Sequence, residues 1–328
     1  MRHAILSGKI IFTLLLVLLV LPTGSCDKKS SKNFIIDLTH TVPTFEPSAA
    51  DPTKPDMSKP IGGSDPRGIP SFGPQTVLSI GAPFNTGQGY FYASRFTSSE
   101  HHGTHFDAPG HYRNNKETTE SDNPDSRLAH ELKPEEMVGP IVLIDVSART
   151  KAELDKNGGQ PSPDPSVTDF SNNSKAVVGP GDIDAVADQL KNGVWLVVNL
   201  GWYPFFHTAD WSKSPYVNGL NFPGLNHAAI DRLIEIEDQK KIRIKGFVVD
   251  NFGVDNGEGS KGIDNKFTNA FYSHVRGLQR GWKMVENANN LGQLSLAKPG
   301  SCSLFAGPLK HVGGSGGPVR VIAECERK

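Results

Sequence analysis

Side chains of the types that bind metal ions crowd into residues 101–111, where four of the eleven histidines of the chain fall. The members of this group that share one sequence parity are His101, His105, Asp107 and His111. An extended segment projects them from one face, while Phe106 points to the other. Gly103 and Pro109 disfavour a helix here, and Gly103 permits the turn that brings His101 near His105. The spacing therefore predicts one shared cation site.

Two imidazoles and a carboxylate are a typical ligand set of a catalytic metal ion. His101, His105 and Asp107 suit zinc best, with manganese and iron as alternatives. Three protein ligands leave a position for water, which favours a catalytic site over a structural one. His111 lies beyond the ligands and is the predicted general base, whereas His102 has the opposite parity and is a bystander or an outer residue. Solvated loop histidines are the alternative, and so dense a group disfavours it.

Length and charge restrict the classes of function. The chain has 328 residues, of which 37% are hydrophobic, and its 34 Lys and Arg residues nearly balance 35 Asp and Glu residues. These values are typical of a soluble globular protein of one or two domains. A formal net charge of −1 provides no broad basic field, so nucleic-acid binding is excluded as the main role.

The first residues have the pattern of an export signal. Arg2 and Lys9 precede an apolar run over residues 10–21, which is shorter than a membrane span. Small residues then lead to Cys26, so cleavage after Ser25 is expected. A lipoprotein peptidase would leave an acylated Cys26 and a polar tether over residues 26–33; plain secretion and a retained anchor are the alternatives. Residues 34–328 then form the exported domain, in the periplasm or on the cell surface.

Two features near the C-terminal end have structural alternatives. Cys302 and Cys325 either pair in an oxidising compartment or are two separate small hydrophobic residues. Residues 313–317 satisfy G-x-S-x-G, the nucleophile elbow of serine hydrolases, which needs a helix after the serine. A strand-like run follows Ser315 instead, so a serine nucleophile is rejected and a turn before a strand is predicted.

The apolar pattern predicts alternating strands and helices. The expected strands cover residues 34–37, 137–146, 194–200 and 244–249. The expected helices are a segment that begins with Asp182 as its N-cap and a second over residues 227–237. Residues 43–74 are expected to form a long loop, and residues 151–176 a polar insertion. This order indicates an α/β fold with a partly parallel sheet.

The histidine group also resembles a known family. The string His-x-Gly-Thr-His-x-Asp-x-Pro-x-His over residues 101–111 is similar to the signature of the cyclase family of metal-dependent hydrolases, which includes bacterial kynurenine formamidase and isatin hydrolase. Further similar segments are residues 37–40, 199–202, 222–225, 246–255 and 313–320. The resemblance covers most of residues 34–324. It implies a swivelling β/β/α fold in a single domain with long loop insertions, and homo-oligomers.

The resemblance also implies a second metal subsite. Family members often bind a second ion through the motif aspartate, a downstream histidine and a glutamate twelve residues later. His274 and Glu286 have that spacing, so Asp107 would bridge two ions. Zn²⁺, as one or two ions, is the expected cofactor, and Mn²⁺ is the alternative. Without the resemblance, a solvated histidine and a helix-end carboxylate would explain the same residues.

The implied reaction is hydrolysis of a C–N bond in a small molecule. The family default is an arylformamidase of tryptophan catabolism, which converts N-formylkynurenine to kynurenine and formate. A hydrolase of a cyclic amide or lactone and a metal-binding surface lipoprotein without activity are the alternatives. Trp202 and Phe106 are the predicted substrate contacts. The aromatic residues over 202–221 either line an aryl pocket or belong to the core or its rim.

Overall fold

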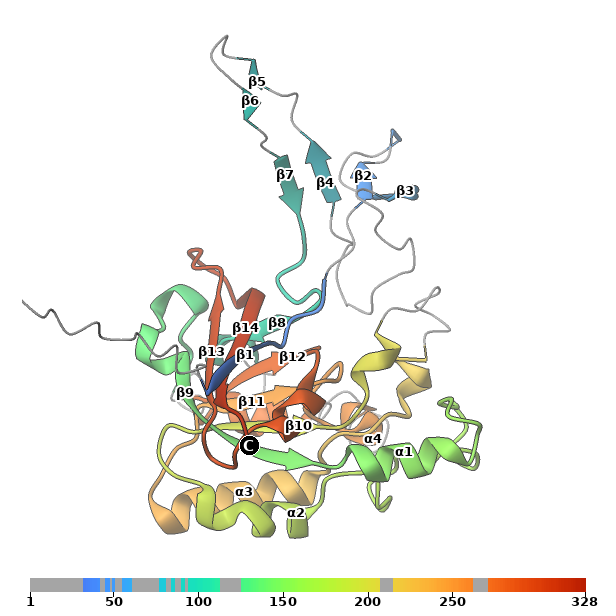
Figure 1. Ribbon diagram of the computed structural model, residues 1–328, viewed down its shortest axis with the longest axis vertical. Coiled ribbons are helices and arrows are strands. Elements are labelled where there is room, and N and C mark those ends of the chain that lie inside the picture. Colours follow the sequence, from blue (N-terminus) through green and yellow to red (C-terminus); the bar gives the residue numbers. More distant parts are fainter. Residues whose placement is uncertain are drawn as a thin grey trace, which may run out of the picture. The chain divides into compact units, whose positions relative to one another are not determined.

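A mixed sheet of 8 strands organises the fold (Figure 1). Its strands are β1 (Asn33–Asp37), β8 (His105–Asp107), β9 (Val138–Asp145), β10 (Trp195–Asn199), β11 (Gly246–Val249), β12 (Lys283–Glu286), β13 (Ser303–Pro308) and β14 (Gly316–Glu326). Their order is β1-β14-β13-β9-β10-β11-β12-β8, and β14 also pairs with β8. That additional pairing closes the sheet into a barrel, to which β1 is attached as an extra strand.

The strands β9, β10, β11 and β12 are parallel, whereas β8, β13, β14 and β1 pair with their neighbours in antiparallel fashion. The α-helices are α1 (Ser147–Asp155), α2 (Pro180–Val186), α3 (His227–Lys240) and α4 (Gly257–Lys261). Figure 1 shows α2 and α3 side by side against the parallel strands. Parallel strands that alternate with helices confirm the expected α/β class.

The structure, a computed structural model, describes residues 32–41, 45–47, 49–50, 55–60, 77–80, 84–85, 90–91, 94–112, 125–206, 215–261 and 271–328. The predicted signal peptide, Cys26 and Trp211 lie outside these ranges. Residues 33–328 form one compact unit. Among the described residues, no helix combines the length and the apolar character that crossing a bilayer requires.

Short turns and small sheets complete the described secondary structure. The 3-10 turns are Pro109–Tyr112, Ala129–Glu131, Pro134–Glu136, Ala187–Gln189, Tyr203–Phe205, Asn218–Leu220 and Leu291–Leu296, and a π-helical turn spans His274–Leu278. The remaining strands are β2 (Phe45–Pro47), β3 (Pro55–Pro60), β4 (Val77–Ile80), β5 (Phe84–Asn85), β6 (Tyr90–Phe91) and β7 (Ser94–Thr97). They form a sheet of order β3-β2-β4-β7 and a β5–β6 pair. The expected loop over residues 43–74 therefore contains two strands.

Two hydrophobic cores lie on opposite faces of the barrel strands. One contains residues from every barrel strand, among them Phe106, Val197 and Val285, and so fills the barrel interior. The other joins alternate residues of the parallel strands, such as Val198, to the apolar face of α3, including Ile230. Because neighbouring residues of a strand point to opposite faces, the parallel strands are buried on both sides.

Two expected element boundaries are wrong. Gly179 is the N-cap of α2, and Asp182 occupies the third helical position, where its carboxylate accepts a hydrogen bond from the Gly179 amide at 2.9 Å. Pro180 sets this earlier start, because a proline favours the first helical turn. The polar insertion expected over residues 151–176 begins inside α1, which ends at Asp155.

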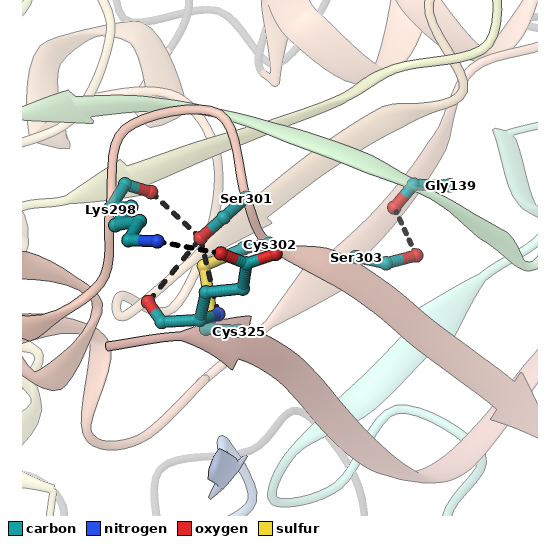
Figure 2. Close-up of a disulfide and its surroundings, with 7 residues drawn as sticks. Gly139, Lys298, Ser301, Cys302, Ser303 and Cys325 are labelled. Atoms are coloured by element: carbon teal, nitrogen blue, oxygen red, sulfur yellow. Dashed lines mark hydrogen bonds and ion pairs between the residues drawn. A yellow bond between two sulfur atoms is a disulfide. The ribbon is translucent and has the colours of Figure 1, made fainter. Parts of the chain in front are cut away.

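A disulfide between Cys302, directly before β13, and Cys325 in β14 (Figure 2) settles the pairing that the sequence left open. Lys298 forms an ion pair with Glu326 at 2.9 Å beside it, and Ser301 donates a hydrogen bond to the Lys298 carbonyl. The two cysteines lie 23 residues apart in the sequence, so the disulfide restricts a loop of that length in the unfolded chain.

Removal of this disulfide is expected to lower stability and to leave activity intact. Replacing both cysteines by serine should reduce the free energy of unfolding by about 3 kcal/mol, the loop-closure entropy for a ring of this size. Urea unfolding of the double variant and of the wild type measures the difference, with turnover as the control. An unchanged unfolding midpoint would contradict the prediction.

A cluster of charged residues fixes the start of β12. Arg127 forms hydrogen bonds with Asp125 and with Glu136 at 2.6–2.9 Å, and Lys283 donates to Glu136 at 3.1 Å. Burial opposes the charge of Glu136, but the hydrogen bonds from Arg127 and the Lys133 amide and the charge of Lys283 outweigh it and lower its pKa to about 2. The ionised carboxylate is therefore the form that the folded state favours.

Glu136→Gln is expected to destabilise the protein in a pH-dependent way. Because the pKa of Glu136 is lower in the folded state, its contribution is complete above pH 4.5 and is lost as the pH falls toward 2. We expect a loss of about 1 kcal/mol at pH 7, since solvent partly screens these pairs. Urea unfolding at pH 7 and at pH 3 measures this, with Glu235→Gln at an exposed pair as the control. Equal losses at both pH values would exclude the mechanism.

Candidate metal centre

Four separate segments carry the predicted ligands into one place. His105 and Asp107 lie at the two ends of β8, and Glu286 at the end of β12 is the register partner of His105. His274 begins the π-helical turn. Gly103 adopts a φ of 63°, which turns the backbone so that His101 approaches β8. The turn expected at Gly103 is therefore present.

The five predicted ligands form one connected cluster of side chains. His101 Nδ1 lies 2.7 Å from Asp107 Oδ1. His105 Nε2 lies 3.4 Å from Asp107 Oδ1 and 3.5 Å from Glu286 Oε2. His274 Nε2 lies 3.4 Å from Asp107 Oδ2 and 3.2 Å from Glu286 Oε1. Asp107 touches all three histidines, which is the position that a bridging ligand requires. Glu286 ends a strand, so its alternative as a helix-end carboxylate is wrong.

Burial makes the cluster suited to a divalent cation. Asp107 is 0% exposed and Glu286 is 4% exposed. Within the described residues, the buried atoms Asp107 Oδ2 and Glu286 Oε1 accept no hydrogen bond of good geometry, although His274 lies at ion-pair distance from both. Two adjacent buried carboxylates are costly unless positive charge compensates them. Imidazole nitrogens with carboxylate oxygens are donors that zinc and manganese accept, so the residues present fit such an ion.

The carboxylates generate a strong negative potential at the centre. Burial opposes protonation of His105, but the charges of Asp107 and Glu286 outweigh it and raise its pKa to about 9. Burial also opposes the charge of Asp107, yet the histidines around it hold the pKa of that carboxyl well below its usual range. A potential that attracts protons to this degree also attracts a metal cation.

Hydrogen bonds outside the cluster orient the imidazoles. His105 Nδ1 lies 2.9 Å from the Gly103 carbonyl oxygen, to which it donates, so Nε2 is left to face the carboxylates. On the other side, Ser273 Oγ lies 3.4 Å from His274 Nδ1, and Asp255 lies at the ion-pair distance of 3.7 Å. A carbonyl or carboxylate behind each ring is the usual support of a metal-binding histidine.

His111 lies beside the cluster on the 3-10 turn Pro109–Tyr112. Its ring stacks on His101 with centroids 3.7 Å apart, and side-chain atoms of His101, Asp107 and His111 lie within 4.8 Å of one another. Burial lowers the pKa of His111 to about 4, against the opposing charge of Asp107. His111 is therefore neutral at neutral pH and can accept a proton. The same distances also place it within reach of an ion.

A cavity of about 310 Å³ opens onto these side chains. Its lining residues are Ser99, His101, His105, His111, Tyr112, Phe252, Phe271, His274, Glu286 and Asn287. The ligand cluster forms one wall, and the three aromatic side chains contribute apolar surface to the rest. A mostly apolar cavity with a few converging polar groups is the usual form of a small-molecule site.

The family comparison agrees with this geometry. A family model described as "Putative cyclase" matches residues 36–256, which is more than half of the chain and includes the histidine group. The chain belongs to the cyclase family. This is the family of metal-dependent hydrolases that the motifs over residues 101–111 resemble.

Solved structures share the fold of this cyclase. An isatin hydrolase bound to the product analogue thioisatinate is 20% identical, with a TM-score of 0.60 over 91% of this chain and 94% of that chain. Isatin hydrolase A from Labrenzia aggregata, bound to benzyl benzoate, is 21% identical, with a TM-score of 0.60 over 91% and 96%. The enzyme from Ralstonia solanacearum is 21% identical, with a TM-score of 0.60 over 90% and 94%. No curated protein matches the cyclase.

Two predicted substrate contacts of the cyclase are wrong. Trp202 and Phe106 are each 0% exposed and do not line the cavity. Trp202 donates from Nε1 to the Tyr216 carbonyl at 2.8 Å, and its backbone amide donates to Asp250. Phe106 belongs to the barrel interior, as the parity of the strand requires. Both side chains are structural.

The sequence interpretation missed the aromatic residues that do line the cavity of the cyclase. Tyr112 directly follows His111, and Phe271 precedes His274 by three positions. Phe252 lies just after β11, at the carboxyl end of a parallel strand, where sites of α/β proteins commonly form. Closeness in sequence to the predicted site residues was the signal available. His102, in contrast, is 1% exposed and does not line the cavity, and its burial and the charge of His105 lower its pKa to about 4.

Proposed function

We propose that this cyclase is a metal-dependent amidohydrolase that cleaves a C–N bond in a small substrate with an aromatic ring. An aryl formamide such as N-formylkynurenine is the default substrate class, and a cyclic amide of the isatin type is the nearest variant. The observation that carries the proposal is one cavity in which a buried cluster of histidines and carboxylates, the neutral base His111 and three aromatic side chains meet.

The aromatic wall supports an aryl substrate. Tyr112, Phe252 and Phe271 face the same cavity of about 310 Å³, which is near the lower limit for small-molecule sites and suits a substrate of one or two rings. The isatin hydrolases that share this fold were solved with thioisatinate and with benzyl benzoate, which both contain an aromatic ring. An aryl group would pack against the wall and direct its carbonyl toward the ligand cluster.

Zn²⁺ or Mn²⁺ would be held by His101, His105 and Asp107, with Asp107, His274 and Glu286 as the set for a second ion. When bound, such an ion supplies Lewis acidity: it polarises a carbonyl and makes water more acidic. The buried residues Asp107 and Glu286 keep the ligand set negative. An aryl group bound against the aromatic wall would displace water from the cavity, which would strengthen these electrostatic interactions.

His111 moves the proton in this reaction. Its neutral imidazole accepts a proton from the water that attacks the carbonyl carbon. As the C–N bond breaks, the same imidazole returns that proton to the departing amine nitrogen. The products are a carboxylic acid, which is formate for a formamide, and an amine; a cyclic amide opens to a single product that carries both groups.

We propose further that the enzyme is exported and works as a homo-oligomer, without a nucleic-acid partner. The apolar run over residues 10–21 and the disulfide support export, because disulfides persist in oxidising compartments. Mass spectrometry of the mature N-terminus separates the alternatives: an acylated Cys26 indicates a lipid anchor, an unmodified residue 26 plain secretion, and residue 1 a retained segment. Light scattering measures the oligomeric state.

Metal analysis of the purified mature protein together with a substrate panel tests the function. The panel contains aryl formamides, isatin-type cyclic amides and aryl lactones. Bound Zn²⁺ or Mn²⁺ with hydrolysis of a formamide or a cyclic amide is expected. Hydrolysis of lactones alone would contradict C–N cleavage, and tightly bound metal with no hydrolysis at all would favour the non-catalytic alternative.

A further inference from the structure

A chain of polar contacts leads from the surface to the metal centre through Glu100 and Ser315, which have no part in the proposed reaction. His311 Nε2 lies 2.6 Å from Glu100 Oε1, and the Ser315 hydroxyl donates to Glu100 Oε2 at 2.6 Å. Ser315 Oγ lies 2.9 Å from His101 Nε2, and His101 Nδ1 lies 2.7 Å from Asp107. Both ring nitrogens of His101 therefore have a defined neighbour.

Strand pairing holds Ser315 in this position. Gly316 at the start of β14 is the register partner of Asp107, and the Ser315 carbonyl accepts a hydrogen bond from the Ala108 amide at 2.9 Å. A Cβ atom on Gly316 would overlap the Phe106 carbonyl oxygen and press against His101. The Ser315 amide donates to Glu100 at 3.0 Å as well. Backbone and side chain therefore fix the hydroxyl behind the His101 ring.

The number of protons in this chain determines the direction of the bonds. A serine hydroxyl has one hydrogen, and an ionised carboxylate only accepts. One Glu100 oxygen, Oε2, accepts from both the Ser315 hydroxyl at 2.6 Å and the Ser315 amide at 3.0 Å. The Ser315 hydrogen therefore points to Glu100, so Ser315 Oγ accepts from His101 Nε2. In a neutral His101, the lone pair then lies on Nδ1, which faces Asp107.

We propose that Ser315 and Glu100 are positioning residues that fix the tautomer and the ring orientation of His101, so that Nδ1 is presented to a divalent cation shared with Asp107. This role rests on the proposed metal-dependent function. It also gives the G-x-S-x-G run a purpose: the glycines allow β14 to approach the metal centre, and the serine supports a ligand instead of attacking a substrate. Outer partners of this kind commonly affect metal affinity.

Metal affinity tests the proposal directly. The apparent Kd for Zn²⁺ is measured by competition with a chromogenic chelator in the wild type, in Ser315→Ala and in Ser315→Thr. Ser315→Ala should bind Zn²⁺ about 10–100-fold more weakly, and Ser315→Thr, which keeps the hydroxyl, should restore most of the affinity. Ser303→Ala removes a hydroxyl on β13 that donates to the Gly139 carbonyl, and it should bind like the wild type (Figure 2).

The tautomer of His101 provides a readout that a merely structural serine would not change. Long-range ¹H–¹⁵N spectra of histidine-labelled, Zn²⁺-loaded protein should show the proton of His101 on Nε2, with the signal assigned from a His101→Gln variant. Ser315→Ala should lose or mix this state. Glu100→Ala should act in the same direction, because the serine hydrogen is then free to point to His101, and it serves if Ser315→Ala does not fold.

Two outcomes separate the proposals. Unchanged Zn²⁺ affinity and an unchanged tautomer in both Ser315→Ala and Glu100→Ala would overturn the positioning role and leave the metal-dependent function intact. A wild type that binds neither Zn²⁺ nor Mn²⁺ would overturn the proposed function itself. Weaker binding that Ser315→Thr does not rescue would also count against the hydroxyl.

Discussion

The His111→Ala variant should keep its metal and lose about 10²–10⁴-fold in kcat, the usual contribution of a general base. His111 is buried beside the ligand cluster, and burial lowers its pKa to about 4, so its imidazole is unprotonated throughout the neutral range. No other histidine that lines the cavity combines this low pKa with a position outside the five predicted ligands.

Turnover on the best substrate of the panel and metal content by mass spectrometry measure this prediction together. His130→Ala is a matched control, because His130 lies on the 3-10 turn Ala129–Glu131 and does not line the cavity. Normal turnover in His111→Ala would contradict the role as base. Loss of both metal and turnover would show instead that His111 is a ligand, which its distances to His101 and Asp107 allow.

Asp107→Asn is expected to abolish both metal binding and turnover. The substitution keeps the shape of the side chain but removes the charge that touches His101, His105 and His274. Loss of an outer partner of a ligand already costs about 10–100-fold in affinity, so loss of the shared ligand itself should exceed about 100-fold. Activity should fall with metal occupancy.

Calorimetric titration with Zn²⁺ and metal analysis after purification measure this effect. Asp155→Asn, in an exposed ion pair with Lys151, is the control for the same chemical change. A folded Asp107→Asn variant with normal metal content would exclude Asp107 as the bridging ligand. Circular dichroism shows whether the variant is folded, because a partner lost from a buried cluster can also destabilise the protein.

Residues close together in the sequence allowed the most accurate predictions. The alternation of His105, Phe106 and Asp107 predicted two opposite faces, and β8 has them, because a strand fixes this alternation locally. The strands and helices of the α/β part were also expected near their observed bounds. His274 and Glu286 were predicted as ligands only through the family resemblance, because nothing in their own segment connects it to residue 107.

Tertiary packing explains the predictions that were wrong. Trp202 is an aromatic residue after a parallel strand, as Phe252 is, yet Asp250 accepts hydrogen bonds from the Leu200 and Trp202 amides and holds that turn in the core. No local sequence pattern shows that Trp202 is buried in the core while Phe252 lines the cavity. Ser315 was correctly rejected as a nucleophile, but its contact with His101 spans 214 positions of sequence and depends on the pairing of β14 with β8.

The closure of the barrel determines when during folding the centre can form. The strand that carries the metal motif has β12 on one side and β14 on the other, and both follow it by well over a hundred residues. Contacts between segments so distant form late, because a long loop must close before they are gained. During synthesis, the nascent chain therefore carries its histidines without an assembled ligand set. The predicted ligands on β8 and β12, His105 and Glu286, therefore meet only once these two strands have paired.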